Sequence, residues 1–115
     1  RDSSVWPARP RASSKSDPAL PPMGTWFRRR AGVAISGYAG EVRAVLEALK
    51  VHGMILADNG SPWYLSGAPN GNWDNDSLRA LADFTGADFE AVDSSCLQAA
   101  PDSGRVRSTL PPRCL

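Results

Sequence analysis

The chain has 115 residues, of which 42% are hydrophobic and 22% are charged, and its net charge is +1 at pH 7. This length allows one domain at most. The near-zero charge gives no general reason to expect nucleic acid as a partner. No apolar run approaches the length that spans a bilayer, so we expect no membrane partner.

Both ends of the chain are rich in Pro, Ser and Arg and poor in large apolar residues. Such segments bury too little apolar surface to offset the entropy lost on ordering. We therefore expect an extended or disordered strap over residues 1–22, an α+β domain over residues 23–93 and a disordered tail over residues 94–115. Because a core of this size leaves little stability to spare, we also expect the chain to be a fragment of a larger protein.

The first half of the domain predicts a strand followed by a helix. Residues 25–36 contain the β-formers Trp26, Phe27, Val33 and Ile35, and their arginines fall on both faces, which indicates an edge or partly exposed strand. Residues 39–52 have the spacing of an amphipathic helix that ends at Gly53. Its apolar stripe consists of Val42, Val45, Leu46 and Leu49, and Glu47 and Lys50 are placed to pair on its other side.

The second half predicts a hairpin, a second helix and a final strand. Residues 54–57 and 63–66 read as two strands that reverse at Asn59-Gly60. Asp74 or Asn75 is expected to cap a helix over residues 77–84, and residues 88–92 form the last strand. The fold class is therefore α+β: a small mixed sheet with a central hairpin, two helices packed on one face and an irregular N-terminal strap.

Three aromatic residues lie close to several carboxylate and amide side chains between residues 58 and 76. Flat rings stack on sugar faces while Asp and Asn bind hydroxyl groups, so this composition indicates a carbohydrate site. The candidate ligand-binding residues are Asp58, Asn59, Trp63, Tyr64, Trp73, Asp74 and Asp76. Packing of the rings in the core and capping by the carboxylates would explain the same residues. On adjacent strand positions, only one of Trp63 and Tyr64 would join the site.

No carboxylate can be assigned as catalytic from the sequence. Hydrolysis needs two of them about 5–10 Å apart, and Asp58 with Asp74 or Asp76 is the pair that one edge of the domain could bring together. The run from Asp74 to Asp76 also offers oxygen ligands to Ca²⁺, but no Glu completes a twelve-residue calcium loop. We expect no metal and no cofactor, and enzymatic activity stays open.

Charge is unevenly distributed along the chain. Residues 1–30 carry seven basic and two acidic residues, and residues 70–93 carry one basic and six acidic ones. We expect these opposite blocks to pair with each other. Trp26 and Phe27 beside Arg28, Arg29 and Arg30 would suit single-stranded nucleic acid, but pairing with the acidic block is favoured and nucleic acid is not the expected partner.

The two cysteines, Cys96 and Cys114, lie in the C-terminal tail. They show neither a CxxC nor a Cys/His spacing, so no zinc site is expected. Free thiols are the favoured interpretation, and a disulfide between them stays open.

Several motifs between Val5 and Asp93 resemble one protein family. They are VWPAR at 5–9, ASSKSDPALPPMG at 12–24, ISGY at 35–38, LEALKVHGMILADNGSPWYLSGAP at 46–69 and WDNDSL at 73–78. The family is an uncharacterised one of larger, secreted bacterial proteins, frequent in actinobacteria, and the resemblance is to its C-terminal part. It implies an extracytoplasmic location, although this chain contains no signal peptide, and a missing N-terminal β-rich portion. It implies no activity for named residues.

Two functions are consistent with these observations. The first is a secreted protein that binds or acts on carbohydrate, with a polysaccharide as its partner. The second is a structural or interaction module that completes a larger β-rich protein, whose partner is the missing remainder of its own chain.

Overall fold

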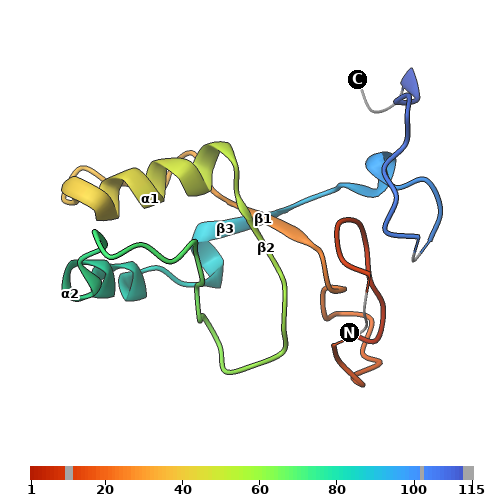
Figure 1. Ribbon diagram of the computed structural model, residues 1–115, viewed down its shortest axis with the longest axis horizontal. Helices are drawn as coiled ribbons and strands as arrows, with labels where there is room; N and C mark the ends of the chain where they lie inside the picture. The colour runs from red at the N-terminus through yellow and green to blue at the C-terminus, as the bar shows by residue number, and fades with distance from the viewer. Residues whose placement is uncertain (10–11, 102, 113–115) are drawn as a thin grey trace. The chain divides into compact units, whose positions relative to one another are not determined.

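The structure is a computed structural model that describes residues 1–9, 12–101 and 103–112 (Figure 1). It confirms the α+β class, with three strands and two α-helices in the described part of the chain. The elements are β1 (Trp26–Arg29), α1 (Gly40–Val51), β2 (Met54–Ile55), α2 (Asn75–Leu78) and β3 (Phe89–Val92), with 3₁₀ turns at Arg79–Asp83, Gly86–Asp88 and Ser95–Leu97.

The strands form one sheet in the order β2-β1-β3. β1 and β2 are antiparallel, with Trp26 opposite Ile55 and Phe27 opposite Met54. The sheet is antiparallel rather than mixed. The predicted central hairpin is wrong, because β2 pairs with β1 and residues 63–66 form no strand.

A turn at Pro62-Trp63 explains why the second hairpin strand does not form. Pro62 has no N–H to donate to a ladder, and Trp63 has a φ of 62°. A positive φ directly after Pro is the combination that a type II turn requires. The chain therefore turns where the sequence suggested that it continues as a strand.

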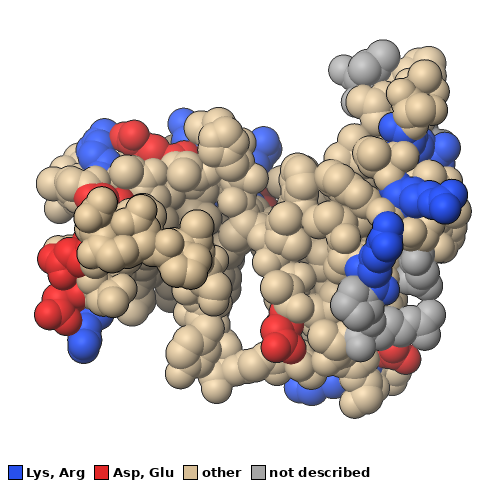
Figure 2. Space-filling model, in the orientation of Figure 1, with Lys and Arg blue, Asp and Glu red and all other residues tan. Residues whose placement is uncertain are grey.

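β1 is the central strand of the sheet and not an edge strand. It is partly exposed, which was the other predicted alternative, and it covers Trp26–Arg29 rather than residues 25–36. Arg29 is 3% exposed, and its side chain is accommodated by backbone carbonyls rather than by water. Arg28 and Arg30 both reach Glu90, at 2.7 and 4.0 Å. These ion pairs join two residues of the basic block to one residue of the acidic block. Figure 2 shows acidic and basic side chains interspersed where the two α-helices lie.

The long helix α1 forms close to the predicted residues and buries the predicted stripe. Val42, Leu46 and Leu49 are buried and Val45 is half-buried. Gly53 has a φ of 71°, which a residue without Cβ adopts at no steric cost, and the helix ends there as expected. α1 also contacts α2 and the 3₁₀ turn that follows it (Figure 1).

Residues of the chain group into two compact units. Unit 1 comprises Arg1–Phe27, Met54–Asn59 and Ala91–Leu115, and unit 2 comprises Arg28–Gly53 and Gly60–Glu90. The core of unit 2 consists of the buried side chains of α1 together with Phe89. In unit 1, Met23 is the buried apolar side chain among the residues that the structure describes.

Unit 1 contains the irregular N-terminal strap. In its described residues the strap has neither helix nor strand, and it is held by single contacts. Ser4 and Met23 form a parallel bridge, the Val5 amide donates to the Met23 carbonyl at 2.8 Å, and the Trp6 and Trp26 rings lie 5.7 Å apart between centroids.

The C-terminal tail folds back on itself in unit 1. Gln98 and Val106 form an antiparallel bridge, and the Arg107 amide donates to the Leu97 carbonyl at 2.8 Å. Cys96 is disulfide-bonded, so the expectation of a free thiol is wrong for this residue. Cys114 lies outside the described residues.

Among the helices of the described residues, none combines the length and the apolar character needed to cross a membrane.

Replacement of Leu46 by Ala tests the core of unit 2. Leu46 is fully buried, so the lost contacts and the cavity should lower the free energy of unfolding by about 3 kcal/mol. The matched control is Leu65→Ala, because Leu65 is 48% exposed and its loss should change stability by less than about 0.5 kcal/mol. Urea denaturation followed by far-UV circular dichroism measures both. Equal losses would contradict the packing of α1 described here.

Candidate functional site

The segment from residue 60 to residue 73 carries the predicted aromatic side chains of unit 2 (green in Figure 1). It contains no helix or strand and leads into α2. Trp63, Tyr64 and Trp73 are 55%, 85% and 42% exposed. None of the three rings is buried in the core, which was the alternative that the sequence left open.

The Trp63 side chain is held in place by packing against one other aromatic ring. Its indole stacks on the buried Phe89, with a centroid separation of 5.4 Å and an interplanar angle of 25°. A Cβ at Gly86 would come within 3.0 Å of the Trp63 Cζ2 atom, so a larger residue there would push against the ring. Trp63 is thus fixed on its inner side and open to solvent elsewhere.

Trp73 is positioned by the turn that precedes it. Its indole Nε1 donates to the Ala68 carbonyl at 3.2 Å, and its backbone amide donates to the Asn70 carbonyl at 3.2 Å. The Asn72 amide donates to the Asn70 side-chain oxygen at 2.9 Å. The Asn70-Gly71 turn therefore sets the orientation of the ring.

Asp74, one of the two predicted caps, is the N-cap of α2. The helix itself is Asn75–Leu78, followed by a 3₁₀ turn over Arg79–Asp83, instead of the predicted helix over residues 77–84. Its carboxylate accepts from the Asp76 amide at 3.0 Å and from the Ser77 hydroxyl at 2.6 Å. The Ser77 hydroxyl, followed by the backbone amides of Asp76 and Ser77, lowers the pKa of the Asp74 carboxyl below its ordinary value. Asp76 forms an exposed ion pair with Arg79 at 3.2 Å. Both carboxylates are engaged in starting the helix.

Asp58 and Asn59 belong to unit 1, whereas the other candidate residues belong to unit 2. The Asp58 carboxylate accepts from the Asn59 amide at 2.7 Å, which is a local turn bond. The expectation that Asp58 shares one edge of the domain with Asp74 or Asp76 depended on the hairpin, and the hairpin is absent. The candidate site is therefore Trp63, Tyr64 and Trp73 with the polar side chains of the same segment.

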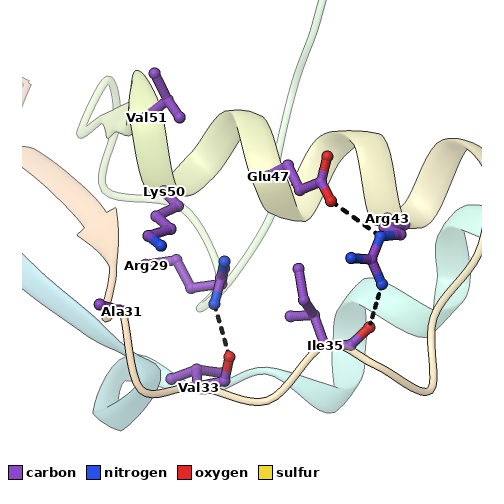
Figure 3. A pocket seen from close by; sticks show the side chains of 8 residues that line it. All are labelled: Arg29, Ala31, Val33, Ile35, Arg43, Glu47, Lys50 and Val51. Atoms are coloured by element: carbon purple, nitrogen blue, oxygen red, sulfur yellow. Dashed lines mark hydrogen bonds and ion pairs between the residues drawn. The ribbon is translucent and has the colours of Figure 1, made fainter.

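A hollow of about 450 Å³ lies elsewhere in unit 2 and was not predicted from the sequence (Figure 3). Three cationic side chains line it: Arg29, Arg43 and Lys50. The Glu47 side chain pairs with Arg43 at 2.9 Å rather than with Lys50. A sequence signal existed in the three consecutive arginines at the end of β1 and directly after it, but the burial of Arg29 could not be read from it.

A second hollow of about 380 Å³ in unit 1 is lined mainly by the proline-rich strap and by Phe27. Neither hollow includes the three exposed rings. Within residues 1–9, 12–101 and 103–112, no group of three or more His, Cys, Asp or Glu side chains could hold a metal ion.

Comparison with known proteins yields no match to a protein-family model, a curated protein or a solved structure.

Titration of the Asp74 carboxyl tests the cap of α2. Because its pKa is lowered in the folded chain, the cap should stabilise α2 fully above the unfolded value of 3.8 and be lost as the pH falls through the folded pKa. In an NMR pH titration, the Asp76 amide shift should therefore change with a midpoint below 3.8. Asp74→Asn keeps an acceptor oxygen but should abolish this step. A midpoint at or above 3.8 would contradict the bonded cap.

Proposed function

We propose that this chain binds carbohydrate through Trp63, Tyr64 and Trp73. We further propose that it is a secreted bacterial protein of the family with the GMILADNGSPWYLSGAP motif, and that its partner is a polysaccharide.

One observation carries the proposal: Trp63 is more than half exposed although its ring stacks on Phe89. Its left-handed backbone is unfavourable for a bulky residue by about 1–2 kcal/mol, and a residue kept in such a conformation by its surroundings often belongs to a ligand site. The stacking on Phe89 offsets this cost and holds the ring still. A rigid, exposed ring loses little entropy when a sugar stacks on it.

Tyr64 and Trp73 extend the aromatic surface that the segment offers. Tyr64 is the most exposed of the three and provides a hydroxyl next to its ring face. The bond from the Trp73 indole to the Ala68 carbonyl restricts that ring. Tyr and Trp supply a large contact area with only two side-chain torsions to fix. The side chains of Asn70 and Asn72 are exposed and close in sequence to these rings, and their NH₂ groups can donate to sugar hydroxyls.

The surroundings of Asp74 do not fit the general acid of a glycosidase. A glycosidase needs a carboxylic acid with a raised pKa to protonate the leaving oxygen. The pKa of Asp74 is lowered instead, and both of its oxygens hold the start of α2.

The disulfide at Cys96 supports the proposed secretion. Disulfides persist in oxidising, extracytoplasmic compartments and are rare where thiols are kept reduced. The bond at Cys96 therefore fits the location that the family resemblance implies.

The small core favours a second candidate function. Five apolar residues of the described chain are buried: Met23, Val42, Leu46, Leu49 and Phe89. Such a core gives a domain a narrow margin of stability. In this role the chain is a structural or interaction module of a larger β-rich protein, and the remainder of that protein covers Tyr64 and Leu65.

Single replacements in the aromatic segment separate the two functions. On glycan arrays, followed by titration of the best glycan, Tyr64→Ala and Trp73→Ala should each weaken binding by about tenfold or more, because each removes a stacking face. The matched control is Leu65→Ala, which removes a half-exposed aliphatic side chain next to Tyr64 in the sequence and should leave sugar affinity unchanged.

Two outcomes would contradict carbohydrate binding. The first is that the unmodified chain retains no glycan on the array. The second is an equal loss for Leu65→Ala and Tyr64→Ala, which would indicate apolar docking of a protein surface instead of ring stacking.

A further inference from the structure

The hollow of about 450 Å³ in unit 2 has the features of a separate ligand site (Figure 3). It lies between the end of β1, the chain that follows this strand and one side of α1. Its volume falls within the range of about 300–1,000 Å³ that small-molecule sites occupy. Its lining combines cationic and aliphatic side chains.

Arg29 brings a buried positive charge to this hollow. The residue is 3% exposed, and its guanidinium is held by backbone carbonyls. Nε donates to Leu46 at 3.0 Å, and Nη1 donates to Val33 at 2.7 Å and to Arg30 at 3.3 Å. Among the described residues no carboxylate lies within ion-pair distance of Arg29. Backbone carbonyls accept from Nε and Nη1 but leave the charge of Arg29 without a counter-ion, and buried charges are normally paired.

The second terminal nitrogen of Arg29, Nη2, has no acceptor in the described part of the chain. Nη2 is also not fully buried, because the fully buried side-chain N and O atoms without a partner among the described residues are Trp26 Nε1 and Gln98 Nε2. This nitrogen therefore retains contact with open space, and Arg29 is a lining residue of the hollow. A planar guanidinium with free N–H groups is suited to accept a carboxylate.

Lys50 adds a second positive charge from α1. Lys50 and Arg29 both line the hollow, Lys50 from the side of α1 (Figure 3). Two like charges that face the same space repel each other unless an anion lies between them. The other charged residues of the lining, Arg43 and Glu47, form an ion pair with each other at 2.9 Å. Arg43 also donates to the Ile35 carbonyl at 3.4 Å. Arg29 and Lys50 therefore have no ion-pair partner among the residues that the structure describes.

The rest of the lining is aliphatic. Val33 and Ile35, both half-buried, come from the chain after β1, and the exposed Val51 comes from the end of α1. An inorganic ion would leave these side chains in water, whereas an organic anion would cover them. Covering aliphatic surface contributes about 25 cal/mol for each Å² removed from water.

We propose that this hollow binds a small organic carboxylate, with its carboxylate between Arg29 and Lys50 and its aliphatic part against Val33, Ile35 and Val51. The site is independent of the aromatic segment and of carbohydrate binding. Bound carboxylate neutralises the Arg29 charge and separates it from Lys50.

Titration with hexanoate, followed by amide shifts in NMR spectra of the full chain, tests the site. Hexanoate should shift the amides of Val33, Ile35 and Val51, and hexanamide, which has the same shape without the charge, should not. Lys50→Gln should weaken the binding of hexanoate by about tenfold, because it removes one charge-assisted hydrogen bond to the carboxylate. Lys15→Gln is the matched control, since Lys15 is an exposed lysine of unit 1. This variant should bind hexanoate with the same affinity as the unmodified chain.

The wild-type comparison of hexanoate with hexanamide needs no variant and holds even if a substitution at Arg29 prevents folding. Equal shifts with the two ligands would overturn the proposal, as would unchanged affinity in Lys50→Gln. Inorganic phosphate that binds as tightly as hexanoate would overturn the assignment to an organic carboxylate.

Discussion

The buried guanidinium of Arg29 joins β1, the chain after it and α1. It donates to the carbonyls of Leu46, Arg30 and Val33, and Leu46 is the most deeply buried residue of α1. An unsatisfied guanidinium at this depth would be costly, so these carbonyls must keep their positions. Because arginine does not lose its proton in proteins, the charge is permanent. The same side chain therefore organises the core of unit 2 and gives the hollow its charge.

Both candidate sites of unit 2 depend on side chains held by the sheet strands. Phe89 of β3 supports the Trp63 ring, and Arg29 of β1 supplies the guanidinium of the hollow. In each case a buried residue fixes a group that remains accessible, which lowers the entropy lost on binding. The two sites differ in chemistry: the first offers ring faces, and the second offers uncompensated positive charge beside aliphatic surface.

Local patterns in the sequence predicted the elements that are stabilised locally. The apolar spacing predicted α1 to within a residue at each end, and the Asp-Asn-Asp run predicted the cap of α2. The hairpin failed because the turn at Pro62-Trp63 outweighed the β-forming composition of Trp63 and Tyr64. With the hairpin absent, Asp58 and Asn59 fall in a different unit from the aromatic side chains. Ring exposure likewise depended on packing that composition does not specify.

The sequence alone determined the α+β class, the buried stripe of α1, its end at Gly53 and the attraction of Arg28 and Arg30 to an acidic partner. These features follow from interactions between residues close in sequence or from the sign of charge. Only the tertiary structure decided that β2 pairs with β1, that Arg29 is buried in the central strand and that Trp63 rests on Phe89. Each of these contacts joins residues that are far apart in the sequence. The residue types limit which partners can meet but do not specify which ones do.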